Sequence, residues 1–134
     1  MPRVAWFVSP HGFGHAARSC AVVEALGAAL PGLEVDLWTT VPAWFFRESL
    51  SGPFRYRPLA CDVGLVQRSP VEEDLAATVA LLERWWSTAE ELHRRVVAAA
   101  LVADRCDLVV CDIAPLGLLA AREAGLPSVL MEDF

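Results

Sequence analysis

The chain has 134 residues, which suits one domain with one sizeable core, since single domains most often have roughly 100 to 150 residues. Its hydrophobic fraction of 55% exceeds the roughly 45 to 50% of ordinary soluble domains, which favours strands buried on both faces or an uncovered partner surface. The net charge of −6 argues against nucleic acid as a partner, because binding to a phosphate backbone requires a basic patch.

The first half of the chain alternates between short apolar runs rich in valine and aromatic residues and segments with apolar residues at helical spacing. Proline and glycine separate these segments, as expected of turns and helix ends. The predicted order is a strand (3–9), a helix (15–30), a strand (33–40), a short helix (42–49) and a strand (54–59).

The second half opens with a mixed loop (60–70) that is long for a connector. Residues 71–104 lack glycine and proline and carry apolar residues at helical spacing, which predicts one long helix or two helices joined end to end. A strand (107–111) closed by an aspartate, a helix (115–124) ended by a glycine and a final strand (127–131) complete the chain.

Five strands separated by helical crossovers predict an α/β fold, a Rossmann-like parallel sheet with helices on both faces. We expect the strand order 3-2-1-4-5. In such sheets, ligands bind beyond the carboxyl ends of the strands, where the order switches between the first and fourth strands. That rule selects two loops, residues 9–17 and residues 112–117.

No apolar run reaches the roughly 20 residues of a membrane span, and the first residues show no cleavage pattern of a signal peptide. We therefore expect a cytoplasmic protein without a membrane span. The four cysteines form no C-x-x-C pair, and three lie in apolar runs, so we expect reduced, structural thiols. These residues are Cys20, Cys61, Cys106 and Cys111.

The first selected loop combines glycines with histidines. Gly12 and Gly14 allow the backbone to approach a ligand, and an imidazole at His15 can act as a general base near neutral pH. The alternative is a structural hydrogen bond of His15 at the start of the helix. Arg18 is expected either to reach an anionic group or to pair with an acidic neighbour. The residues predicted to bind substrate are His11, Gly12, Phe13, Gly14 and Arg18.

The second selected loop begins at Asp112. A carboxylate at the end of the fourth strand can orient an imidazole and stabilise its protonated form, so we predict a catalytic pair of His15 and Asp112. The alternative for Asp112 is a turn or helix-cap role before Pro115. We predict no metal site, because His11 and His15 have no carboxylate partner at a recognisable ligand spacing.

Residues 12–17 also match the dinucleotide fingerprint G-x-G-x-x-A. That fingerprint requires an acidic residue at the end of the second strand, and this chain has Thr39 and Thr40 there. A nicotinamide-dependent oxidoreductase therefore remains an alternative function. Two aromatic clusters, Trp44 to Phe46 and Trp85 to Trp86, are interpreted as core or domain-interface packing rather than as a platform for sugars.

Three blocks carry a resemblance to a known family. A first strand running into Pro-x-x-x-Gly-His is similar to the opening of GT-B-type glycosyltransferases, and the blocks together resemble the glycosyltransferase-like N-terminal region of L-arabinokinases and their bacterial relatives. They are His11-Gly12-Phe13-Gly14-His15-Ala16-Ala17-Arg18, Asp62-Val63-Gly64-Leu65-Val66-Gln67 and Asp107-Leu108-Val109-Val110-Cys111-Asp112.

The resemblance implies a GT-B fold of two facing Rossmann domains, of which this chain is the N-terminal, acceptor-side domain and the second domain is absent. It implies a nucleotide-sugar donor as co-substrate, no further cofactor, and roles for His15 as base and Asp112 as its support. The extra residue and second histidine before the Gly-His motif leave open whether His11 or His15 is the base. Because the arabinokinase-like region is attached to a sugar kinase domain, a non-catalytic sugar- or nucleotide-binding domain is a further alternative. We expect the isolated chain to be inactive.

Overall fold

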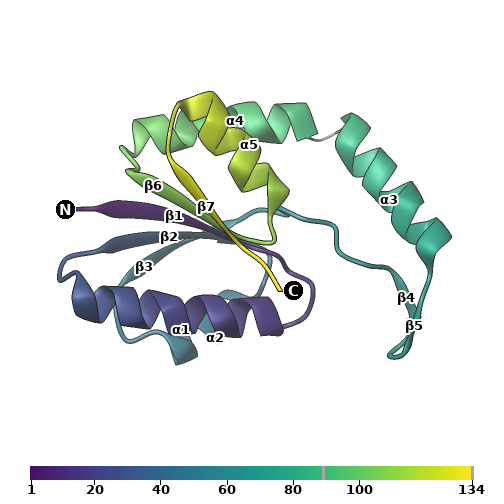
Figure 1. Ribbon diagram of the computed structural model, residues 1–134, viewed down its shortest axis with the longest axis horizontal. Coiled ribbons are helices and arrows are strands. Elements are labelled where there is room, and N and C mark those ends of the chain that lie inside the picture. The colour runs from purple at the N-terminus through teal and green to yellow at the C-terminus, as the bar shows by residue number, and fades with distance from the viewer. Residues whose placement is uncertain (89, 134) are drawn as a thin grey trace.

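Five parallel strands form the central sheet in the order β3-β2-β1-β6-β7 (Figure 1). The computed structural model describes residues 1–88 and 90–133. The strands are β1 (Arg3–Val8), β2 (Glu34–Thr39), β3 (Phe54–Pro58), β6 (Leu108–Asp112) and β7 (Ser128–Met131). The predicted parallel sheet and its 3-2-1-4-5 order are confirmed, so the strand order does switch between β1 and β6.

Helices cover both faces of the sheet (Figure 1). Helices α1 (Gly14–Ala29) and α2 (Ala43–Ser49) pack on one face, where Trp6 and Phe46 are fully buried. Helices α4 (Glu90–Ala103) and α5 (Pro115–Ala124) cover the other face, together with buried Phe7 and Leu116. Neighbouring residues of β1 thus enter opposite cores, which explains why its sequence is apolar from Val4 to Val8 rather than alternating.

The segment between β3 and α4 differs from the prediction. Residues 67–73 form a small antiparallel hairpin, β4 (Gln67–Ser69) and β5 (Glu72–Glu73), so a helix starting at residue 71 was wrong. Helix α3 (Leu75–Thr88) begins after Asp74, whose carboxylate accepts the backbone N–H of Ala77 at 2.9 Å and so caps the helix. Residues 75–88 and 90–103 are helical, in line with the expectation of one long helix or two helices joined end to end; residue 89 between them lies outside the described residues. The hairpin and α3 project from the sheet (Figure 1).

The four cysteines are buried and unpaired, as expected for structural thiols. Burial raises the pKa of the Cys61 thiol to about 12 and also raises the pKa of Cys111, so neither is a reactive thiolate near neutral pH. Among the described residues, no helix is long and apolar enough to cross a membrane.

The contact of α5 with the sheet leads to a stability prediction. A Cβ atom added at Gly117 would lie 2.5 Å from the Cys111 sulfur and 2.6 Å from the Phe7 ring, both fully buried. We expect Gly117→Ala to lower the free energy of unfolding by about 1–3 kcal/mol through overpacking. The matched control is Gly27→Ala on α1, where the added Cβ meets nothing within 4 Å and should stabilise by about 0.5–1 kcal/mol. Urea unfolding of both variants measures the difference, and equal effects would contradict the packing argument.

Candidate active site

The loop between β1 and α1 brings two histidines to the carboxyl edge of the sheet. Gly12 has a φ of +73°, a left-handed conformation that favours glycine, and α1 begins two residues later at Gly14. The loop is tied to the neighbouring strand because the Ser9 backbone N–H donates to the Asp112 carbonyl at 3.1 Å. His11 and His15 therefore lie beside the end of β6, where the strand order switches.

Asp112 is the last residue of β6, opposite Val8 in register, and its side chain is fully buried. The next residue, Ile113, has a φ of 45°, a left-handed conformation that is strained for a β-branched side chain. Pro115 then occupies the first turn of α5. The chain thus turns sharply after Asp112, and backbone strain stored at this point is typical of functional sites.

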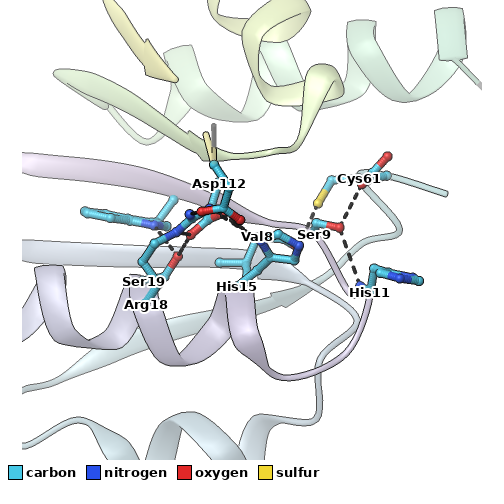
Figure 2. Close-up of polar contacts among 11 residues, drawn as sticks. Val8, Ser9, His11, His15, Arg18, Ser19, Cys61 and Asp112 are labelled. Carbon is cyan, nitrogen blue, oxygen red and sulfur yellow. Dashed lines mark hydrogen bonds and ion pairs between the residues drawn. The ribbon is translucent and has the colours of Figure 1, made fainter. Parts of the chain in front are cut away.

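His15 and Asp112 are in contact, as the sequence predicted (Figure 2). His15 Nδ1 lies 3.1 Å from Asp112 Oδ1, and the His15 side chain keeps an exposed fraction of 19%. When Nδ1 carries the proton and donates it to the carboxylate, the lone pair of Nε2 is free to accept a proton from a ligand. The pair thus has the chemistry of a general base supported by a carboxylate.

Further groups surround the Asp112 carboxylate. Arg18 Nε donates to Oδ2 at 3.1 Å, Arg18 Nη2 donates to Oδ1, and Arg18 Nη1 donates to Asp133. Ser19 Oγ donates to Oδ2 at 2.8 Å and accepts the Trp6 indole N–H at 3.0 Å. The hydrogen bond to Asp112 raises the pKa of Arg18, so the guanidinium remains charged. Arg18 was expected either to reach an anionic group or to pair with an acidic neighbour, and in the structure it pairs with Asp112 and Asp133.

Sequence reasoning missed Ser19, Asp133 and Trp6. Ser19 follows His15 by four residues on a helix and therefore shares its face, a spacing that could have been recognised. Asp133 follows the end of β7 by two residues, so the rule that selected the carboxyl edge also applied to it. The indole of Trp6 gave no sequence signal, because its hydrogen bond depends on how α1 packs on β1.

A second polar group surrounds His11. Ser9 Oγ donates to Asp62 Oδ2 at 2.7 Å, and a Cβ added at Gly64 would approach His11 Nδ1 to 2.8 Å, so the 62–64 segment packs against His11. Within the described residues, the side-chain hydrogen bonds of Asp112 reach His15, Arg18 and Ser19 rather than His11. Figure 2 shows the His11 ring apart from this carboxylate. The two histidines therefore have different surroundings, and the supported one is His15.

A hollow of about 300 Å³ opens at the site. The residues that line it are His11, Gly14, His15, Arg18 and Asp133. A larger hollow of about 570 Å³ lies elsewhere, between the far end of α1 and β2, and its carboxylates Glu24 and Glu34 already bind Ser51 and Arg3. In residues 1–88 and 90–133, no three His, Cys, Asp or Glu side chains gather in a way that could hold a metal ion.

Aromatic side chains border the same loop. Phe13 stacks on Phe45 with ring centroids 5.1 Å apart and lies 5.9 Å from Trp44. Phe13 and Trp44 are each 48% exposed, whereas Phe46 is fully buried. The expectation of core packing therefore holds for Phe46, and Trp44 lies on the surface with Phe13. In the other cluster Trp85 is buried and Trp86 is half-exposed.

No protein-family model matches the chain. L-arabinokinase of Arabidopsis thaliana is 33% identical over 134 residues, which is 97% of this chain but only 12% of that protein.

The solved structures with similar folds have low sequence identity. A UGT transferase from Siraitia grosvenorii in complex with UDP has a TM-score of 0.61 and 16% identity, over 98% of this chain and 28% of that chain. Acinetobacter baumannii MurG has a TM-score of 0.58 and 20% identity, over 97% of this chain and 35% of that chain. The C-terminal domain of a Pyrococcus furiosus hydrogenase has a TM-score of 0.55 and 11% identity, over 97% and 91%. The chain is thus similar in sequence to a small part of L-arabinokinase, and it has the Rossmann-like α/β fold that is found in the UGT transferase and in MurG.

Proposed function

We propose that this chain is the N-terminal, acceptor-side domain of a GT-B-like glycosyltransferase that transfers a sugar from a nucleotide-sugar donor to an acceptor hydroxyl. The observation that carries the proposal is the contact of 3.1 Å between His15 Nδ1 and Asp112 Oδ1, placed where the strand order switches. The fold shared with a UDP-bound UGT transferase supports the choice of donor. We also propose that the protein is cytoplasmic.

The chemistry assigned to the pair is an inverting displacement. His15 Nε2 removes the proton of the acceptor hydroxyl while the oxygen attacks the anomeric carbon of the donor sugar. The bond between that carbon and the diphosphate oxygen breaks, and the nucleoside diphosphate leaves with the electron pair. The imidazolium that forms is stabilised by the buried Asp112 carboxylate, which lies 3.1 Å from its Nδ1 atom.

Substrate contacts are assigned to the loop that holds the histidines. His11 and Gly14 line the hollow, and the half-exposed Phe13 and Trp44 offer an apolar rim at the start of α1. Gly12 keeps the backbone of the loop accessible. Arg18 belongs to the site through Asp112 and Asp133, since both are already bound to its guanidinium.

The donor is assigned mainly to a second domain. The chain spans 12% of the arabinokinase and 28% of the UGT transferase, so most of the length of these proteins has no counterpart in it. We therefore expect the complete protein to combine this acceptor side with a donor-binding Rossmann domain. A non-catalytic sugar- or nucleotide-binding domain that regulates a fused enzyme is the second candidate, favoured by the arabinokinase similarity.

A nicotinamide-dependent oxidoreductase is less well supported by the site. Its fingerprint needs a carboxylate at the end of the second strand to bind the ribose hydroxyls. Here Thr39 is fully buried and its hydroxyl accepts the backbone N–H of Val41 at 3.1 Å. The side chain at that position is thus a buried hydroxyl that binds the backbone of Val41, and not a carboxylate that faces the crevice.

Calorimetric binding and turnover distinguish these functions. We expect the protein encoded by the whole gene to bind UDP or a UDP-sugar in preference to NAD⁺, and to release UDP faster when a hydroxyl acceptor is added. The 134-residue chain alone should bind the donor weakly and show no turnover. Preference for NAD⁺, or strong transferase activity from this chain alone, would contradict the proposal. Binding of the UDP-sugar without turnover across a panel of acceptors would favour the regulatory domain.

A further inference from the structure

The Nδ1 atom of His15 lies near two groups that favour opposite protonation states of this nitrogen. Asp112 Oδ1, a hydrogen-bond acceptor, lies 3.1 Å away, and Arg18 Nη2, which can only donate, lies 3.4 Å away. If Nδ1 carries the proton, it donates to Asp112. If Nδ1 is unprotonated, it accepts from Arg18 and opposes the lone pairs of the carboxylate.

The outcome of this competition decides whether His15 can act as a base. A neutral imidazole carries one N–H, so a proton on Nδ1 leaves the lone pair on Nε2. The opposite tautomer places the N–H on Nε2, where it cannot accept a proton. The hydrogen bond to a carboxylate is charge-assisted and within the usual range, whereas 3.4 Å is longer than an ordinary N–H donor distance, which favours the Nδ1–H tautomer.

Arg18 also fixes the orientation of the Asp112 carboxylate, the favoured partner of Nδ1. Its planar guanidinium makes a bidentate contact, or fork, with Asp112: Nε donates to Oδ2 at 3.1 Å, and Nη2 donates to Oδ1. Ser19 occupies Oδ2 as well, at 2.8 Å, which leaves Oδ1 turned toward His15. Arg18 Nη1 donates to Asp133, and this second ion pair holds the guanidinium in place. Figure 2 shows Arg18 and His15 meeting at Asp112.

We propose that Arg18 is a positioning residue that orients Asp112 so that His15 is held as the Nδ1–H tautomer, with Nε2 free to accept a proton from the substrate. The assignment rests on the proposed function in assuming that His15 is the base. The tautomer itself can be measured without any turnover. Besides His15 and Arg18, the charged or titratable groups that line the hollow are His11 and Asp133.

The test is long-range ¹H–¹⁵N NMR of the ¹⁵N-histidine-labelled chain at alkaline pH, where ring nitrogens that carry hydrogen have different shifts from those that do not. We expect mainly Nδ1–H for His15, assigned by the loss of its signals in His15→Gln. Arg18→Met removes both the fork that orients Asp112 and the contact of 3.4 Å with Nδ1, and the loss of the fork should dominate because that contact is longer than an ordinary hydrogen bond. The ratio of Nδ1–H to Nε2–H should therefore fall about fivefold or more, as expected for weakening a charge-assisted hydrogen bond. Arg18→Lys should not restore the ratio, because an ammonium cannot reproduce the bidentate contact with Asp112.

The matched control is Arg55→Met, which removes an equivalent fork on buried Asp36 at a different site. Its His15 signals should match those of the unchanged chain, and thermal midpoints should show that both variants are folded. An unchanged ratio in Arg18→Met, an equal change in Arg55→Met or full restoration by Arg18→Lys would overturn the proposal. Absence of transferase activity, with these NMR results as expected, would instead overturn the proposed function and leave the positioning role in place.

Discussion

His15→Ala in the complete protein is expected to lower turnover by about 10²- to 10⁴-fold, the usual contribution of a general base. That loss corresponds to roughly 3–5.5 kcal/mol of barrier. Donor affinity should stay nearly unchanged, because the donor contacts are assigned to another domain. The physical reason is the partner of His15: its Nδ1 lies 3.1 Å from a fully buried carboxylate that stabilises the protonated ring.

His11→Ala is the matched control, because it removes an imidazole from the same hollow. We expect it to raise the apparent KM for the acceptor while turnover at saturation changes little. If His15 only shaped the start of α1, its loss would cost about 1 kcal/mol of stability, the scale of a lost cap, and turnover per folded molecule would be intact. Thermal midpoint and turnover measured on the same samples separate these outcomes, and unchanged turnover would remove His15 from the catalytic role.

The sheet could be predicted because its signals are local. Most of its strands are short apolar runs bounded by proline or glycine, although β3 contains two arginines. Right-handed crossovers then leave few ways to arrange the strands. The hairpin at residues 67–73 could not be recognised in this way, since strands of three and two residues are too short for a periodic pattern. Asp74 was a readable signal, because an aspartate before an apolar helical pattern marks a helix start.

Part of the site could be predicted from the rule that ligands bind beyond the carboxyl ends of parallel strands. That rule selected the loops of His15 and Asp112, and the two side chains do meet. The partners of Arg18 depended on tertiary packing, because Asp112 and Asp133 lie 94 and 115 residues away in the chain. From residue types alone, an arginine beside a crevice suits an anionic ligand as well as an acidic neighbour.

Asp112→Ala is expected to lower the free energy of unfolding by about 3 kcal/mol, the lower end of the range for breaking a buried ion pair. Asp112 is fully buried, accepts hydrogen bonds from Arg18 and Ser19, and contacts His15 Nδ1 at 3.1 Å. The loss should stay at the lower end because the Arg18 side chain is 27% exposed and keeps Asp133 as a partner. Asp112→Asn keeps the shape of the side chain and one acceptor oxygen, so it should destabilise less.

Turnover should fall in both variants of Asp112, since neither keeps a carboxylate beside His15 Nδ1. The control is Asp36→Ala, which removes the other buried aspartate that binds an arginine in a fork, Arg55. Asp36 lies two residues before Trp38 and so on the sheet face opposite α1. We expect Asp36→Ala to destabilise to a similar degree in urea unfolding while turnover per folded molecule is unchanged. If Asp36→Ala and Asp112→Asn lowered turnover equally, the effect would come from stability, and Asp112 would have no specific role toward His15.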